Sequence, residues 1–492
     1  MSQLIRHFCL VSMIFAVCNV AATALADKFT YVERDGSKVE VEARLVGSGR
    51  GQHVLELADG QYRLVAQAAV LKREISEGPE PLTPDQVIEQ LATRFGRTNF
   101  RGYAEGHFVI GLILGEPLPK SLETRAKSCL KKSARFMSNV ERNFKAFTKR
   151  MRIETRPPTH PLVLLVFESD DDFEKYNSEI TGGRGMSAGA TAGFYSPITN
   201  WLAIRMSECL TFATPLHEAI HQQVFNQHVL QRLAPTPAWF NEGIATGFEG
   251  NGDRINRGPS KVSVRYSRMV HKAKNIDWQD LVNGDKAFRG DIFAGEAYIH
   301  AWSMHWLLVS RYKDEYVEYI RNLAKKTPFQ EQSASQRKSE FEDIFGKSTN
   351  DLQSEFPKAL QSALKRQRLP KEKPRRRGEL TIQSNLAEVT VMAIGRGGLL
   401  ETEGAIRNIS AIRPMTFHIV VQTNSGKYAD WVIPNLGINK TARLPRQLAR
   451  KMMRGAPGGA STTFGIRVNS AAPTSENGRQ WKAGNTPVPT FR

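Results

Sequence analysis

The segment His217-Glu218-Ala219-Ile220-His221 is the clearest indication of fold and chemistry in this chain of 492 residues. On a helix, side chains four positions apart lie on the same face, so the two imidazoles can bind one metal ion. Zinc accepts histidine nitrogens, and the glutamate between them can take the proton of an attacking water. Catalytic zinc sites use three protein ligands, so we expect a third ligand downstream.

Glu242 is the candidate third ligand. It lies in the segment Trp239-Phe240-Asn241-Glu242-Gly243-Ile244-Ala245, an apolar helix start that contains one carboxylate. The preceding helix is expected to begin at Thr214-Pro215, an N-cap followed by a first-turn residue, and apolar residues recur at helical spacing behind the histidines. The sequence therefore predicts a zinc (Zn²⁺) site formed by His217, His221 and Glu242, with Glu218 as the general base.

The two segments together resemble the gluzincin metallopeptidases, and WFNEGIA is similar to the corresponding segment of the aminopeptidase N family. The resemblance implies the same four roles and a thermolysin-like catalytic domain, with a mixed sheet, a helical lobe and the metal between them. It also implies an oxyanion-stabilising Tyr or His downstream, which favours Tyr298, with His305 in reserve. An ordinary core tyrosine is the alternative for Tyr298. His300 and His228 are expected to be structural or surface residues.

The sequence departs from these families in two places, of which the first concerns the tuning of the metal site and the second narrows the expected activity. Thr246 stands where thermolysin-like gluzincins have an aspartate that orients a ligating histidine, and Glu249, expected on the same helix, is an alternative acceptor. The Gly-Ala-Met-Glu-Asn motif that binds a free amino terminus in the aminopeptidase N family is absent, so an endopeptidase is favoured. Residues 193–206 are predicted to form two strands around a Ser-Pro turn, either a rim strand that pairs with an extended peptide or a plain edge strand.

Residues 1–26 are predicted to be a secretory signal peptide. A basic start precedes an apolar run that ends in Ala24-Leu25-Ala26, which predicts cleavage after Ala26 and export to the periplasm, the cell surface or the medium. An uncleaved anchor is the alternative. Cys129 and Cys209 would remain in the mature chain, and we expect two unpaired buried residues, although export permits a disulfide.

Length predicts about three domains, and the order of the expected strands and helices, together with the resemblance, implies the α+β class. Residues 27–76 alternate short strands with turn signals and are expected to form a small SH3-like β-barrel. Residues 83–369 are the expected catalytic domain, in which alternating helices and strands precede a helical half. Residues 370–378 form a basic linker, residues 379–470 a β-sandwich, and residues 471–492 a flexible tail.

The net charge of +19 and the pI near 9.8 predict attraction to anionic surfaces. No nucleic acid is expected as a partner, because the sequence has no recognised reading motif. An anionic envelope polymer or membrane surface and plain solubility are the two interpretations that remain open. Two functional classes remain: an exported zinc endopeptidase that acts on peptide or protein substrates, and a cell-envelope binding protein on a peptidase-like scaffold. The retained Glu218 favours the enzyme, because a scaffold needs no general base. The sequence does not predict the oligomeric state.

Overall fold

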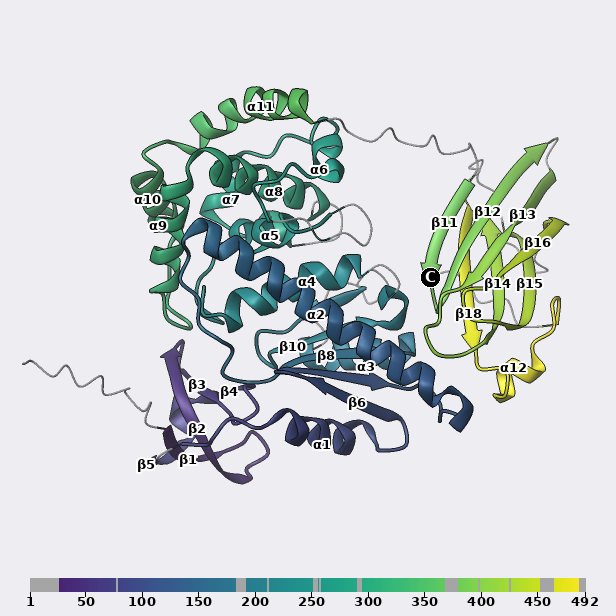
Figure 1. The fold of residues 1–492 in the computed structure, drawn as a ribbon, viewed down its shortest axis with the longest axis horizontal. Helices are drawn as coiled ribbons and strands as arrows, with labels where there is room; N and C mark the ends of the chain where they lie inside the picture. Colours follow the sequence, from purple (N-terminus) through teal and green to yellow (C-terminus); the bar gives the residue numbers. More distant parts are fainter. Residues whose placement is uncertain are drawn as a thin grey trace, which may run out of the picture.

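Figure 1 shows the computed structural model, in which an N-terminal sheet, a central body of helices and strands, and a C-terminal pair of sheets follow one another along the chain. This arrangement confirms the α+β class. The structure describes residues 26–76, 78–182, 192–209, 212–250, 255, 258–289, 294–367, 379–396, 399–423, 426–451 and 464–485. Most of the predicted signal peptide and all of the predicted basic linker lie outside these residues. No helix within these ranges is long and apolar enough to span a membrane.

The N-terminal part is an open five-stranded sheet rather than the expected closed barrel. Its elements are β1 (Ala26–Val32), β2 (Lys38–Gly49), β3 (Gln52–Glu56), β4 (Tyr62–Ala66), the 3-10 helix η1 (Gln67–Ala69) and β5 (Val70–Ser76). The order β4-β3-β2-β1-β5 leaves β4 and β5 as edges of the described sheet. β2 carries a register shift between Leu45 and Gly47; its first half pairs with β1 and its second half with β3. Such a bulge increases the local twist, so the sheet curves without closing.

A five-stranded mixed sheet forms the middle of the molecule. Its strands are β6 (Phe100–Glu105), β7 (Phe108–Ile113), β8 (Leu162–Phe167), β9 (Gly193–Tyr195) and β10 (Trp201–Arg205). They lie in the order β6-β7-β8-β10-β9. β7, β8 and β10 run parallel and are apolar almost throughout, as expected for strands that are covered on both faces. β9 pairs antiparallel with β10 and forms one edge of the sheet.

Two pairs of helices cover the two faces of this sheet. They are α1 (Pro84–Phe95) and α3 (Asp170–Thr181) on one face, and α2 (Glu123–Met151) and α4 (Ala213–Asn226) on the other. The alternation of side chains along β8 explains the division. Val163 and Leu165 belong to the core under α1 and α3, whereas Leu162 and Leu164 belong to the core under α2 and α4. α4, which carries the histidine motif, contacts both β10 and the edge strand β9.

The second half of the central part is helical. It contains α5 (Ala238–Thr246), α6 (Val264–Met269), α7 (Trp278–Asn283), the 3-10 helix η4 (Lys286–Phe288), α8 (Ala294–Arg311), α9 (Lys313–Ala324), α10 (Ala334–Phe345) and α11 (Thr349–Arg366). Two further 3-10 helices, η2 (Lys120–Leu122) and η3 (Met206–Cys209), precede α2 and α4. α5 packs closely on α8, and Gly243 permits this because a Cβ there would lie 2.1 Å from His305 Cδ2. Cys129 on α2 and Cys209 in η3 are both buried, with no disulfide between them.

Two four-stranded antiparallel sheets form the C-terminal part, in the orders β11-β12-β13-β16 and β17-β15-β14-β18. The strands are β11 (Glu379–Ser384), β12 (Ala387–Arg396), β13 (Leu399–Asn408), β14 (Met415–Thr423), β15 (Lys427–Leu436), β16 (Thr441–Leu448), β17 (Arg450–Lys451) and β18 (Phe464–Ala471). The structure describes the expected flexible tail as far as residue 485. This segment contains α12 (Glu476–Gln480), which packs on β14 and β18. A buried ion pair, Arg413 Nε to Glu168 Oε1 at 2.6 Å, joins this part to the central sheet.

Candidate metal centre

α4 carries His217 and His221 one helical turn apart. Both imidazoles are buried, and their rings meet edge to face with centroids 4.8 Å apart. A neighbouring face of the helix packs into the core through three apolar residues, Leu216, Ile220 and Val224. The predicted N-cap was wrong: the helix begins at Ala213, and its N-cap is Phe212, whose φ of 52° is left-handed. The helical spacing, rather than the capping residue, therefore positions the histidines.

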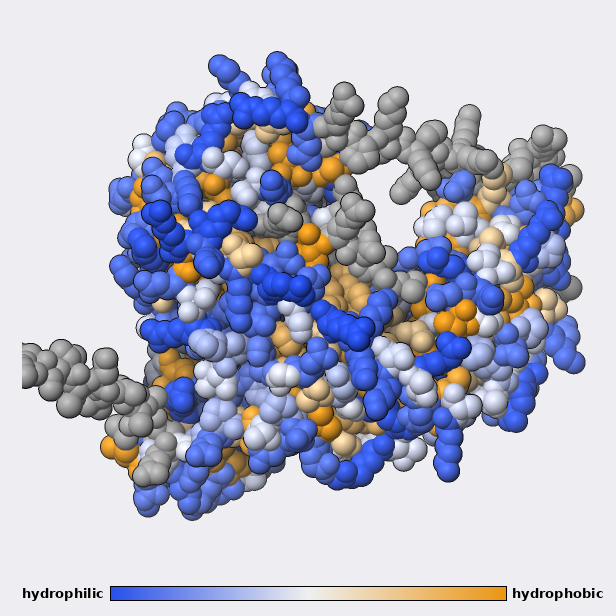
Figure 2. All heavy atoms as spheres, in the orientation of Figure 1, coloured by the Kyte–Doolittle hydropathy of each residue, from blue (hydrophilic) through white to orange (hydrophobic). Residues whose placement is uncertain are grey.

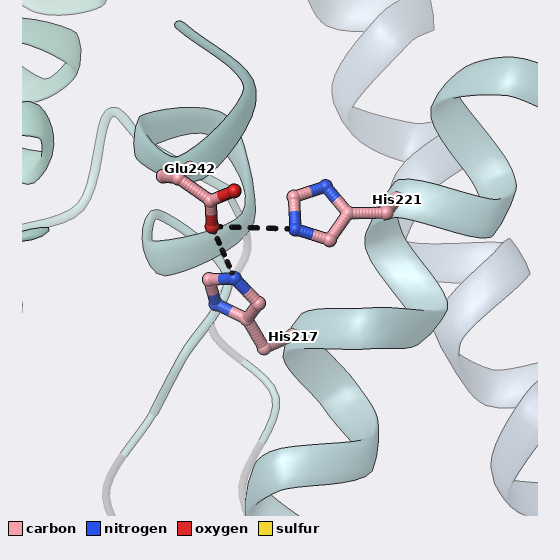
Figure 3. Close-up of side chains that lie close together, drawn as sticks. All are labelled: His217, His221 and Glu242. Atoms are coloured by element: carbon pink, nitrogen blue, oxygen red, sulfur yellow. Dashed lines mark hydrogen bonds and ion pairs between the residues drawn. The ribbon is translucent and has the colours of Figure 1, made fainter. Parts of the chain in front are cut away.

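Glu242 on α5 completes a group of three ligand atoms (Figure 3). Its Oε2 lies 2.9 Å from His217 Nε2 and 3.5 Å from His221 Nε2. All three ligand atoms lie within 4.8 Å of one another. In a tetrahedral zinc site the bond lengths separate neighbouring ligand atoms by about 3.3 Å. Two imidazole nitrogens and one carboxylate oxygen at these separations fit a zinc ion.

The acidic and basic side chains of this group balance one another, and a metal ion would take the place of the proton that His217 holds here. Burial alone would raise the pKa of the Glu242 carboxyl, but His221 and His217 hold that pKa well below its usual range. For His217, burial favours the neutral ring, whereas hydrogen bonds to Glu242 and Glu249 outweigh it and raise the pKa of the imidazole. Glu242 is therefore ionised, which is the form that a metal-binding carboxylate requires.

Glu218 lies beside the ligand group and is held by the edge of the sheet. Its Oε2 accepts a hydrogen bond from the backbone N–H of Tyr195 on β9 at 2.9 Å. Burial raises the pKa of the Glu218 carboxyl, and the two neighbouring histidines offset part of this rise. A raised pKa brings a carboxylate closer to the range in which it acts as a general base near neutral pH. The contact with β9 had no signal in the sequence, because it depends on how the sheet packs against α4.

Glu249 forms the hydrogen bond that orients His217. The sequence analysis named it as the alternative to the aspartate that thermolysin-like gluzincins have at the position of Thr246. Its Oε1 lies 2.9 Å from His217 Nδ1. The expectation that Glu249 lies on the same helix as Glu242 was wrong, because α5 ends at Thr246. Glu249 Oε2 accepts hydrogen bonds from the Tyr266 hydroxyl at 2.9 Å and from Arg265 at 3.1 Å. These two residues of α6 were missed, because they have no fixed spacing from the motif.

Glu249→Ala should lower the affinity for zinc about 10- to 100-fold, since removal of a partner that orients a ligating histidine has effects of that size. The affinity can be measured by competition with a chromophoric chelator. Glu179→Ala, at an exposed glutamate on α3, is the matched control and should bind zinc as the wild type does. An unchanged affinity in Glu249→Ala would mean that this carboxylate does not orient the ligand.

The structure brings Tyr298 to the same cluster. Its ring centroid lies 5.8 Å from that of His217, and on another side it meets the Phe288 ring edge to face. Burial raises the pKa of the Tyr298 phenol, and the charges of Glu242 and Glu218 raise it further. The hydroxyl therefore keeps its proton and can donate a hydrogen bond, as an oxyanion-stabilising group must.

His305 and His300 lie in packing positions instead. The His305 ring packs on Phe240, its Nδ1 hydrogen-bonds the Tyr316 hydroxyl at 3.1 Å, and burial lowers its pKa to about 3. His305, the reserve candidate for oxyanion stabilisation, is thus a neutral residue of α8 that packs against α5. His300 accepts a hydrogen bond from the Trp278 indole at 3.2 Å, which agrees with the structural role expected for it.

Part of the chain matches a described protein family. Residues 211–330 match a family described as "Protein of unknown function (DUF1570)". The matched segment contains all three ligand residues together with Glu218, Glu249 and Tyr298, and it contains neither the N-terminal sheet nor the C-terminal sheets. No curated protein matches the chain. The family similarity therefore coincides with the candidate site and assigns no activity to it.

Proposed function

We propose that this protein is a zinc-dependent endopeptidase with a thermolysin-like catalytic domain. One observation carries the proposal: Glu218 interacts with the charges of a group of two histidines and one glutamate, and its carboxylate is fixed by the edge strand β9. A scaffold that only binds zinc needs the ligands alone. A buried carboxylate with a raised pKa beside them is what hydrolysis requires.

In this proposal the residues of the site have distinct roles in metal binding, proton transfer and oxyanion stabilisation. His217, His221 and Glu242 would hold the ion through Nε2, Nε2 and Oε2. When bound, zinc supplies a Lewis acid that polarises a carbonyl and lowers the pKa of water. Glu218 takes the proton of the attacking water and delivers it to the leaving amine. Tyr298 donates a hydrogen bond to the developing oxyanion, and the buried surroundings strengthen both interactions.

β9 supports an extended peptide as the substrate. It is an edge of the central sheet, where within the described residues it pairs with a strand on one side only, and its Tyr195 N–H is donated to Glu218. An extended peptide can add to such an edge through backbone hydrogen bonds, which do not depend on the peptide termini. Because Tyr195 on the same strand holds Glu218, a peptide bound there would lie close to the general base.

The test is metal analysis of the purified protein, combined with digestion of a mixed peptide library whose amino termini are either free or blocked. We expect one zinc per chain and the same internal cleavage of both libraries, because the amine-binding motif is absent. Cleavage of free termini alone would identify an exopeptidase. Zinc binding without any cleavage would favour the cell-envelope binding protein.

Tyr298→Phe should lower kcat about 100- to 1,000-fold and leave zinc bound, because it removes one oxyanion donor and keeps the ring. Steady-state kinetics with a quenched fluorescent peptide would measure the loss. Tyr312→Phe, which removes a hydrogen bond to Glu355 away from the cluster, is the matched control and should be active. If both variants were equally active, Tyr298 would be an ordinary core residue.

We also propose that the mature protein works outside the cytoplasm, where its net charge, which is +19 in the full sequence and loses only Arg6 with the signal peptide, would draw it to an anionic envelope surface. β1 begins at Ala26, so cleavage after this residue would leave the strand intact from Asp27 onward. All six residue pairs between β1 and β2 involve residues from Asp27 onward, so none of them would be lost, and on the β5 side the pair of Ala26 with Ser76 would be lost.

A further inference from the structure

Cys129 and Cys209 are the two cysteines that lie outside the predicted signal peptide, and they come from different elements of the central part. Cys129 lies on α2, whereas Cys209 is the last residue of η3, shortly before α4 begins. Figure 2 shows mainly hydrophilic side chains over α2, which crosses this face of the molecule. Both cysteines instead belong to the core, with 7% of Cys129 and 2% of Cys209 exposed.

Two contacts hold the chain on either side of the start of α4 against one face of α2. Lys132, which follows Cys129 by one helical turn, donates a hydrogen bond from Nζ to the carbonyl of Cys209 at 2.7 Å. One turn further along, the Phe136 ring stacks on the Phe212 ring with centroids 4.3 Å apart. Residues three or four positions apart share a helical face, so Cys129, Lys132 and Phe136 form a row. Cys209 therefore lies beside the turn of α2 that carries Cys129.

The two thiols contact each other at this point. They share a hydrogen bond, which lowers the pKa of the Cys129 thiol although burial alone would raise it, and which raises the pKa of the Cys209 thiol. Disulfides join cysteines whose Cβ atoms lie about 3.5 to 4.5 Å apart. Two thiols that already touch need little backbone movement to meet this condition.

We propose that Cys129 and Cys209 form a disulfide in the exported protein. The bond ties α2 to the residues immediately before α4, and it thereby fixes the position from which the histidine-bearing helix begins. It also closes a long loop that contains β8, α3 and β10, and a cross-link across a long loop restricts the unfolded chain most. Its occurrence in the cell rests on the proposed export, whereas the pairing of the two residues does not. Neither rests on peptidase activity.

The oxidant is a disulfide of the export compartment, carried by a small molecule or by an oxidising protein. The thiolate of one cysteine attacks this disulfide and releases one thiol. The thiolate of the other cysteine then attacks the mixed disulfide and releases the second thiol, so the oxidant gains the two electrons and two protons that the cysteines lose. Because both side chains are buried, the exchange takes place before the core around α2 has packed, and burial afterwards shields the bond from reductants.

The first measurement tests the pairing in the purified full chain. The reduced protein is incubated with oxidised glutathione at a denaturant concentration just below that of unfolding, and a digest made without reductant is analysed by mass spectrometry. We expect the peptides of Cys129 and Cys209 joined to each other, two hydrogens lighter than the sum of the free peptides. Two free thiols, or one glutathione on each cysteine, would show that the two residues do not meet and would overturn the proposal.

The second measurement tests whether the bond exists in the cell. Cells are lysed in an alkylating reagent, and the exported protein should carry no label on Cys129 or Cys209. Labelled cysteines in the exported protein would overturn the proposal even if the pair can be oxidised after purification. A labelled chain that remains in the cytoplasm would instead overturn the export on which the bond depends.

Thermal unfolding of the exported protein measures what the bond contributes. A phosphine reductant should lower the Tm by at least about 3 °C, because reduction frees the unfolded chain from the cross-link. The variant that combines Cys129→Ala with Cys209→Ala has no thiol at either position and is the matched control. Its Tm should be the same with and without the reductant. An unchanged Tm in the wild type, or an equal shift in the control, would show that the bond does not hold α2 to the start of α4.

Discussion

Glu218→Gln should lower kcat/KM for peptide cleavage by about two to four orders of magnitude while zinc stays bound. The glutamine amide has nearly the shape of the carboxylate, and its oxygen can still accept the hydrogen bond from Tyr195 on β9. It cannot take up a proton near neutral pH, so only the general base is removed. The measurement is kcat/KM on a quenched fluorescent peptide, together with the zinc content of the same sample.

The matched control is Glu179→Gln, which makes the same chemical change at an exposed glutamate on α3 that pairs with Arg94. This control should retain both activity and zinc. A Glu218→Gln protein that cleaves as fast as the control would remove Glu218 from the mechanism. If neither protein cleaves any peptide although both bind zinc, the site is better described as a binding scaffold.

The parts of the site that could be predicted are those set by local spacing. His217 and His221 meet because they lie four residues apart on one helix, and this holds wherever the helix packs. Glu242 could be predicted because its helical segment resembles that of a known family. Glu249 was named from the sequence as a possible acceptor but was expected on the wrong element, because the chain leaves α5 at Thr246 before this carboxylate returns to His217. Its position depends on contacts with α6, which the sequence does not specify.

The pairing of strands far apart in the chain could not be predicted from the sequence either. Turn signals predicted the strands of the N-terminal part, but whether a sheet closes depends on pairs between residues far apart in the chain. The structure leaves β4 and β5 unpaired with each other in the described sheet. The fold of the C-terminal tail could not be predicted for the same reason, because it depends on contacts with distant strands. Its composition predicted flexibility, whereas Ala471 and Ala472 are buried, and the Ser475 hydroxyl caps α12 by accepting the Gly478 N–H at 3.0 Å.

Removal of any one ligand should cost more zinc affinity than removal of Glu249. We expect His217→Ala, His221→Ala and Glu242→Ala each to lose more than about a hundredfold, because the loss of an orienting partner alone costs up to about that factor. The three variants should also differ in stability without metal. His217→Ala leaves the Glu242 and Glu249 carboxylates without the imidazole that both contact, whereas Glu242→Ala removes one of these charges.

Zinc content after dialysis against a weak chelator tests this prediction, and thermal unfolding of the metal-free proteins tests the order of stabilities. His271→Ala, at an exposed histidine outside the cluster, is the matched control and should keep one zinc per chain. We expect metal-free His217→Ala to unfold at a lower temperature than metal-free Glu242→Ala, since it retains two partly buried carboxylates, Glu242 and Glu249, that have lost their shared partner. Full zinc occupancy in all three variants would show that the ion binds elsewhere, and the catalytic roles proposed for Glu218 and Tyr298 would then lose their basis.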